Sequence, residues 1–151
     1  MRKRIKNYLS LIARLLMGAT FLWFGCMKLF VFGPGGTAQY LGDVFHAPVP
    51  ALATWVAIAV EILGGLAIAL GFKTRSAAMV LAVWCLFTGF AFHLPLGDLA
   101  NMANFFKNLT MAAGLLYLVA YGPGTLAISR VGRRGISRWL SWRSVEPLAN
   151  A

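Results

Sequence analysis

Four long apolar runs dominate the sequence, at about residues 9–32, 51–72, 76–95 and 104–121. As a helix, each run approaches or exceeds the roughly 20 residues that cross a hydrocarbon core of about 30 Å. Helices are expected, because a bilayer offers no partners to open backbone groups. Only 12% of residues are charged, against about 25% in soluble domains. The sequence therefore predicts an all-α integral membrane four-helix bundle over residues 1–129, followed by a basic tail over 130–151.

The first run has a competing interpretation as a signal peptide, because "MRKRIK" precedes it. Against that interpretation, Arg14 interrupts the apolar region and no A-x-A cleavage site follows. The run also continues into "LWFGCMKLFVF". We therefore interpret it as a membrane span.

Basic residues mark one side of the predicted membrane. Of the 14 Lys and Arg residues, 11 lie in three polar segments: 2–6, 73–75 and 130–143. The segments 33–50 and 96–103 carry no Lys or Arg, and instead hold Asp43, Asp98 and His46. By the positive-inside rule, both termini and the 73–75 turn are expected to be cytoplasmic. The chain is thus predicted to be a multi-pass membrane protein with both termini on the cytoplasmic side.

Two polar segments leave alternatives open. The glycine- and proline-rich segment 33–50 is predicted to be a loop, either on the surface or dipping into the outer interface through Tyr40, Leu41, Val44 and Phe45. The tail is predicted to be an amphipathic helix on the cytoplasmic leaflet or a disordered basic segment. The tail residues expected at the lipid surface are Arg133, Arg134, Arg138, Trp139 and Trp142.

Ionisable residues inside the spans are expected to face the bundle interior and to pair with one another. Helical spacing places Arg14, Gly18, Gly25 and Lys28 on one stripe of the first span. Glu61 shares a face of the second span with Gly64. Such small residues allow close packing, either within the monomer or between copies in a homo-oligomer.

The depth of these groups along their spans predicts a polar pocket in the outer half of the bundle. Glu61 lies ten residues after residue 51, or about 15 Å along a helix. His93, Lys107 and Asn108 lie closer to the outer ends of their spans. We therefore predict that Lys28, Lys107 and His93 line the mouth, with Asn108 beside them, and that Glu61 forms the floor and pairs with Lys28 or Lys107.

The plainer interpretation is structural. A Glu–Lys pair can simply lock two helices in register, and His93 can be an interfacial residue. Lysines near helix ends can extend to the interface, and we expect Arg14 to do so at the cytoplasmic end. Cys26 and Cys85 are expected to be inert packing thiols, since nothing near them in sequence marks a low-pKa thiolate.

Several function classes are disfavoured. No paired histidines suggest a haem or zinc site, so no metal is predicted. No dinucleotide fingerprint, P-loop or nucleophile elbow occurs, so no catalytic residue is assigned. The net charge of +10 is explained by membrane topology, and nucleic-acid binding is not expected.

Four ordered stretches carry a family resemblance: "RLLMGATFLWFGCMKLF", "VEILGGLAIALGFKTRSAA", "FTGFAFH" and "FFKNLTMAAGLLYLVAYGPG". Together they cover about residues 14–124. In these stretches the chain resembles the DoxX family of small four-span bacterial membrane proteins. The resemblance implies a location in the bacterial inner membrane. The family's recurring polar positions correspond here to Arg14, Lys28, Glu61, Lys107 and Asn108.

The resemblance implies a place in membrane redox chemistry. Some members look like parts of thiosulfate:quinone oxidoreductases, and others like parts of complexes linking superoxide and thiol defence. The expected function is therefore a quinone-linked or redox-complex membrane subunit, non-autonomous as an enzyme. It would have no intrinsic cofactor and would need a redox-enzyme partner subunit to carry electrons. The alternatives are a membrane scaffold or assembly factor, and a small anion or proton transporter.

Overall fold

The computed structural model describes residues 2–94 and 98–128, and these residues form helices and connecting turns without a strand. In chain order the elements are α1 (Arg2–Cys26), the π-helical η1 (Met27–Val31), α2 (Gly33–Asp43), α3 (Pro50–Leu70), α4 (Thr74–His93) and α5 (Leu99–Tyr121). The predicted tail residues Arg133, Arg134, Arg138, Trp139 and Trp142 lie outside the described part of the chain.

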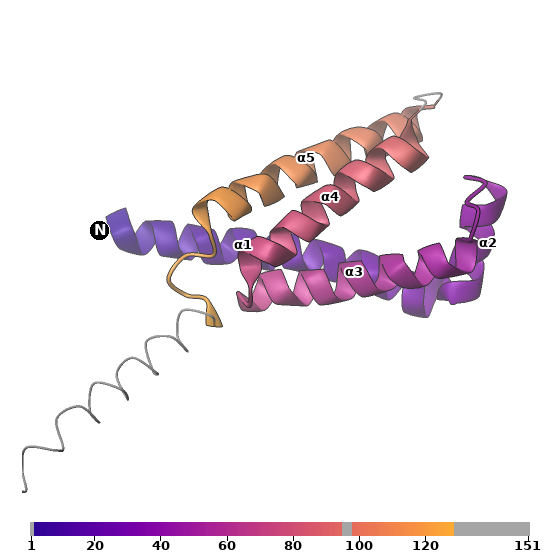
Figure 1. Ribbon diagram of the computed structural model, residues 1–151. Coiled ribbons are helices and arrows are strands. Elements are labelled where there is room, and N and C mark those ends of the chain that lie inside the picture. The colour runs from indigo at the N-terminus through magenta and orange to yellow at the C-terminus, as the bar shows by residue number, and fades with distance from the viewer. Residues whose placement is uncertain (1, 95–97, 129–151) are drawn as a thin grey trace, which may run out of the picture.

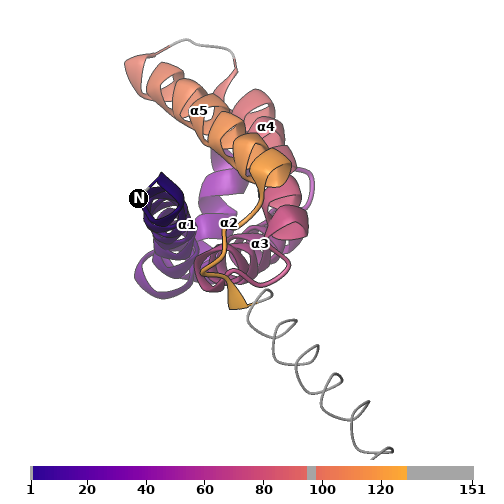
Figure 2. The ribbon, with the colours of Figure 1, turned by 90° about the vertical axis from the view of Figure 1, so that its left-hand side faces the viewer.

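The long helices form two antiparallel pairs, α1 with α3 and α4 with α5 (Figure 1). The pairs approach each other near the α3–α4 turn and separate toward α2 (Figures 1 and 2). The hydrophobic core lies where they meet. It draws Phe21 from α1, Ile68 from α3, Leu81 from α4 and Leu115 from α5.

Glycine determines how closely α1 and α3 pack. A Cβ atom on Gly18 would lie 2.7 Å from the Gly65 carbonyl oxygen and 2.8 Å from the Ala69 Cβ.

Gly71 ends α3 at φ +76°, and its backbone N–H donates to the carbonyls of Ala67 and Ile68. Such a left-handed cap is typical of glycine. It leads directly into α4, so α3 and α4 run antiparallel.

The predicted loop over residues 33–50 is wrong for its first eleven residues, which form α2 (Gly33–Asp43). Pro34 lies in the first turn of α2, where its missing N–H is no loss. The Thr37 side chain is buried, and its hydroxyl donates to the Lys28 carbonyl oxygen at 3.5 Å. Gly35 and Gly36, which suggested a turn, have open space around them.

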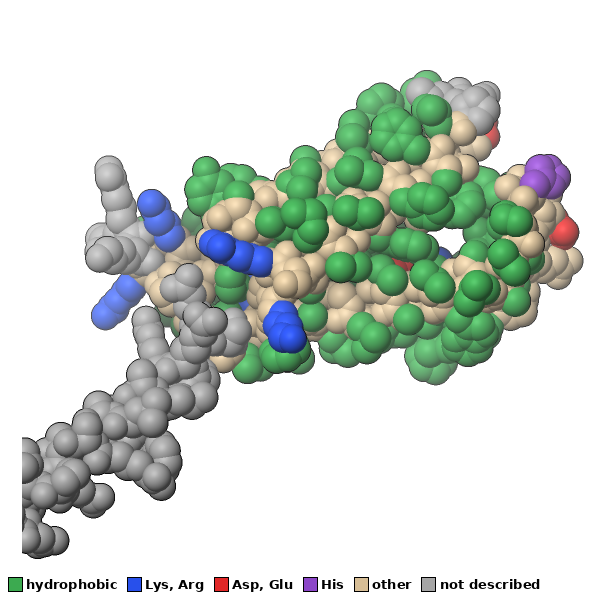
Figure 3. Space-filling model, viewed as in Figure 1, with side chains coloured by type: hydrophobic (Ala, Val, Ile, Leu, Met, Phe, Trp, Pro, Cys, Tyr) green, Lys and Arg blue, Asp and Glu red, His purple; other side chains and the backbone are tan. Residues whose placement is uncertain are grey.

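The outer surface suits a lipid environment. Three helical segments are long and apolar enough to cross a membrane: Arg4–Val31, Pro50–Leu70 and Thr74–His93. Large apolar side chains cover the face shown in Figure 3. Leu16 and Leu63 are 66% and 65% exposed. α5 is also long, with 23 residues, but its first half holds Asn101, Asn104, Lys107 and Asn108.

Candidate functional site

A cavity of about 610 Å³ lies between the two helix pairs, on the side where they separate. Most of its wall is apolar or aromatic, with Phe24 from α1, Phe45 from the α2–α3 connection and Phe87 from α4. Figure 3 shows an opening between the pairs, with acidic and basic atoms visible at its edge. Helices therefore form the walls of the cavity, and the gap between the two helix pairs leaves it open at one side.

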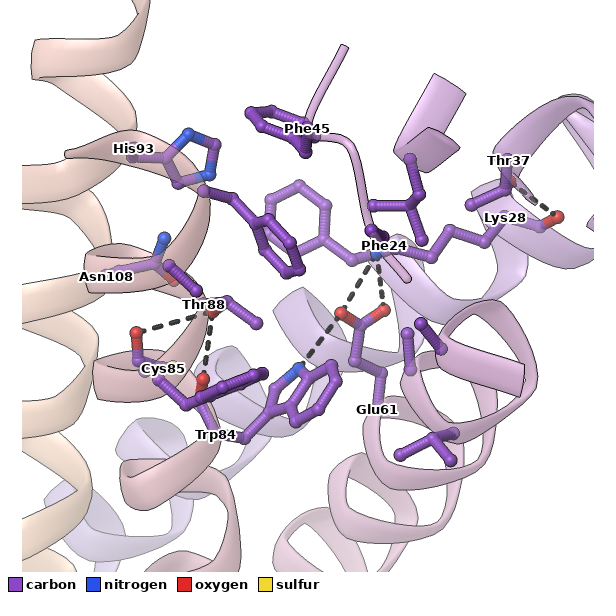
Figure 4. A pocket seen from close by; sticks show the side chains of 18 of the residues that line it. Phe24, Lys28, Thr37, Phe45, Glu61, Trp84, Cys85, Thr88, His93 and Asn108 are labelled. Atoms are coloured by element: carbon purple, nitrogen blue, oxygen red, sulfur yellow. Dashed lines mark hydrogen bonds and ion pairs between the residues drawn. The ribbon is translucent and has the colours of Figure 1, made fainter. Parts of the chain in front are cut away.

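An ion pair forms one polar wall of the cavity (Figure 4). Lys28 Nζ donates to Glu61 Oε2 at 2.7 Å and to Oε1 at 2.9 Å. Trp84 Nε1 from α4 also donates to Oε1, at 3.4 Å. Glu61 is only 7% exposed. Its carboxylate is thus held by groups from both helix pairs, which is how a charged group is accommodated inside a membrane protein.

Local backbone features bring this pair together. Lys28 lies in η1, where α1 widens into a π-helical turn, and such turns are frequent at functional sites. Gly25 lies one turn before Lys28, and a Cβ atom there would be 3.3 Å from the Glu61 Cβ. The missing side chain at Gly25 allows α1 to pass close beside Glu61.

Lys107 forms a second cationic group on the opposite wall, contributed by α5. Its Nζ donates to Asn104 Oδ1 at 2.8 Å and lies 4.7 Å from the centroid of the Phe24 ring of α1. The structure therefore pairs Glu61 with Lys28 and leaves Lys107 against an amide and an aromatic face. Asn108, one residue later, also lines the cavity, and its Nδ2 donates to the Asn104 carbonyl at 3.1 Å.

His93 lies at the end of the cavity that is farther from the α3–α4 turn. Its Nδ1 is 3.3 Å from Asn101 Oδ1, and its ring packs edge-on to Phe45 with the centroids 5.9 Å apart. Phe45 also packs against Phe92. This cluster places His93 in the cavity wall beside aromatic rings, on the far side from Glu61 in Figure 4.

The prediction that Arg14 extends to the interface is wrong. Arg14 is only 1% exposed, and its Nη2 donates to the Leu126 carbonyl oxygen at 2.8 Å. Its guanidinium packs against Gly71 at the end of α3. Arg14 is separate from the cavity and fastens the segment after α5 to α1.

The two cysteines are free thiols. Cys85, in α4, is buried at 1% exposure and lies in the cavity wall. Cys26 is half-buried. Within the described ranges no three His, Cys, Asp or Glu side chains come together as metal ligands. The polar groups of the cavity include ammonium, carboxylate, amide, indole, imidazole and hydroxyl groups, which are suited to hydrogen-bonding an organic ligand.

Sequence reasoning missed Trp84, Phe24 and Phe45 as parts of the site. None carries a charge: Phe24 and Trp84 lie in apolar runs, and Phe45 was considered only as part of the predicted loop. The one available signal was position, since Trp84 precedes Cys85, which shares a helical stripe with His93. The pairing of α4 with α3, which turns the indole toward Glu61, has no marker in the local pattern.

Comparison with known proteins agrees with this architecture. The chain is 37% identical over 129 residues to the inner membrane protein YqjF of Escherichia coli, covering 85% of this chain and 95% of that protein. It is 36% identical over 127 residues to the E. coli inner membrane protein YphA, covering 81% and 89%. No solved structure matches the chain. The DoxX family profile matches residues 9–94, which run from within α1 to just past the end of α4 and include the Lys28–Glu61 pair. The chain is thus a member of the DoxX family.

Proposed function

We propose that this chain is a multi-pass inner-membrane protein whose cavity binds a quinone or quinol, and that it serves as the membrane subunit of a redox complex. The observation that carries the proposal is the apolar cavity with a buried Glu61–Lys28 pair and a side opening between the helix pairs. Quinones dissolve in the bilayer, so a lateral opening is the route by which they would enter.

The proposal includes four spans with both termini on the cytoplasmic side. α5 is as long as the other spans and packs antiparallel to α4. Lys73 and Arg75 lie at the α3–α4 end of the bundle, while Asp43 and Asp98 lie at the opposite end. This charge distribution supports the proposed orientation. The similarity to two E. coli inner membrane proteins supports the location.

The cavity has the groups that a quinone needs. A volume of about 610 Å³ is within the range of small-molecule sites, which is about 300–1,000 Å³. Aromatic walls suit a flat ring. The Lys28 ammonium and the Asn108 amide each keep one N–H that can donate to a ring oxygen, beyond the bonds that they make to Glu61 and to the Asn104 carbonyl. When a quinol is oxidised it releases two protons and two electrons. Glu61 would accept one proton, the second would pass to water at the outer end of the cavity, and a partner subunit would take both electrons.

The experiment is purification of the protein from native membranes in mild detergent, followed by quinone extraction and mass spectrometry of co-purifying proteins. We expect quinone close to one per chain, together with a redox subunit. Thr88→Phe should reduce the retained quinone several-fold, because Thr88 lines the cavity and its hydroxyl bonds only to the α4 backbone.

A matched control is Thr110→Phe, at an exposed α5 residue whose hydroxyl also bonds only to its own helix, at the Phe106 carbonyl. This variant should retain quinone like the unaltered protein. Equal retention in both variants would show that the quinone is bulk membrane lipid. A preparation without quinone or a redox subunit would contradict the proposal.

A further inference from the structure

The charges around the cavity do not balance. Two ammonium groups, Lys28 and Lys107, line the cavity, together with a single carboxylate, Glu61. Lys28–Glu61 is the one salt bridge among the side chains of residues 4–94 and 98–128. The Lys107 ammonium contacts only neutral groups there, the Asn104 amide and the Phe24 ring. With Lys28 neutralised by Glu61, one positive charge is left over.

The position of Lys107 makes this excess informative. It is the ninth residue of α5, about 12 Å along the helix from Leu99 at 1.5 Å per residue. A long side chain at this depth often extends toward the interface. Here the Nζ instead reaches across from α5 to an aromatic ring of α1. Lys107 is an exposed residue of α5, so within a bilayer it would border lipid as well as the cavity. An uncompensated charge in such apolar surroundings is costly, and a ring face compensates it only in part.

From this imbalance we infer that the preferred ligand is a flat ring compound with one ionised acidic hydroxyl, whose negative oxygen is bound at Lys107. This inference rests on the proposed function, because it concerns the same cavity, and it specifies the chemical class of the ligand. Opposite charges a few ångströms apart attract far more strongly in a low-dielectric cavity than in water. A ligand of this class would fill the cavity and would also neutralise the excess positive charge at Lys107.

The test compares two ligands with nearly the same body. Lawsone is a hydroxynaphthoquinone that is an anion at neutral pH, and its methyl ether is neutral. Binding of each is measured by isothermal titration calorimetry to the full chain in phosphatidylcholine nanodiscs, with empty nanodiscs as the partitioning blank. We expect lawsone to bind at least about tenfold more tightly, the change produced by one modest charge contact.

Three variants test whether Lys107 is the cause of the preference for lawsone over its methyl ether. Lys107→Gln should reduce it to less than about twofold while the methyl ether still binds, and Lys107→Arg should keep it. Lys73→Gln is the matched control. Lys73 also lies over a phenylalanine ring, that of Phe72 at 5.9 Å, but at the α3–α4 turn away from the cavity. This control should bind like the unaltered chain.

The outcomes separate the two proposals. Equal binding of lawsone and its ether would overturn the charge inference and leave the quinone site standing. A preference that survives Lys107→Gln would overturn the assignment to Lys107. Binding of neither compound would count against the quinone site and the inference together.

Discussion

At the scale of single residues, Glu61 is the group on which the site depends. A lone carboxylate in the middle of an apolar helix would be strongly unfavourable. Here it accepts two hydrogen bonds from Lys28 and one from Trp84. Three segments, η1, α3 and α4, therefore meet at a single side chain, and any change there affects both stability and the cavity.

The first prediction separates the contribution of Glu61 to stability from its role in the cavity. Glu61→Gln and Lys28→Met should each lower the free energy of unfolding by roughly 2–4 kcal/mol, because each leaves a buried group without its partner. The double variant should recover most of that loss, since a neutral pair carries no buried charge. Thermal unfolding of the detergent-solubilised protein, followed by size-exclusion chromatography, measures the three values.

Quinol-linked turnover of the complex, measured in the same variants, completes the test. If Glu61 takes part in ligand chemistry, the stable double variant should still fail to support quinol-linked turnover of the complex. A double variant with full turnover would show that the pair only locks the helices together. A double variant no more stable than either single variant would contradict the ion-pair account of stability.

Arg14 leads to a second prediction at this scale. Its buried guanidinium bonds to the Leu126 carbonyl, so Arg14→Met should release the segment after α5. Hydrogen exchange of peptides covering residues 122–128 should rise several-fold. Arg75→Met is the control, because Arg75 is exposed and makes only a 3.4 Å bond to the Ala120 carbonyl. Unchanged exchange in Arg14→Met would contradict the role of Arg14 as a fastener.

At the scale of elements, the α1–α3 contact is set by backbone approach at Gly18 and Gly65. Gly18→Ala should therefore destabilise the protein by about 1–3 kcal/mol, because the added Cβ would meet the Gly65 carbonyl and the helices would have to separate. Thermal unfolding measures the loss. Gly36→Ala in α2 is the matched control: nothing lies within 4 Å of its Cβ position, and alanine favours a helix there. Equal stability of both variants would contradict this packing.

The elements also show what the sequence could predict. The apolar runs placed α3 and α4 to within two residues at each end, because burial in lipid needs unbroken apolar length. α1 begins seven residues before its predicted span and α5 begins five residues before its span, since both helices start in polar sequence. Helical spacing brought Glu61 onto a packed face. The helix α2 was missed because Pro34, Gly35 and Gly36 read locally as a turn, whereas the buried Thr37 contact with Lys28 holds the segment in place.

The site was predictable only where it was charged. Lys28, Glu61 and Lys107 stand out in any apolar run, and all three line the cavity. Which lysine pairs with Glu61 depends on how the two helix pairs separate and on the π-helical turn at Lys28. Both are consequences of tertiary packing, which local spacing does not contain. The inward turn of Arg14 was missed for the same reason, because its partner lies 112 residues away.

At the scale of the whole molecule, two helix pairs meet at one end and separate at the other, so the cavity opens at the end opposite Lys73 and Arg75. If that basic end is cytoplasmic, the cavity lies in the outer half of the membrane. The orientation of α5 decides this, because α5 contributes Lys107 and is the long helix that is not among the three candidate membrane spans.

Single cysteines at the two ends of α5 test the crossing directly. In a background with Cys26→Ala and Cys85→Ala, Leu99→Cys should react with a membrane-impermeant maleimide in intact spheroplasts. Tyr121→Cys should react only after permeabilisation. Both positions are exposed, at 81% and 70%, so access is limited by the membrane and not by the fold. Val49→Cys and Phe72→Cys, at the ends of α3, are the matched outer and inner controls. If Leu99 and Tyr121 react from the same side, α5 does not cross, and Lys107 cannot face a ligand that enters through the outer half of the bilayer.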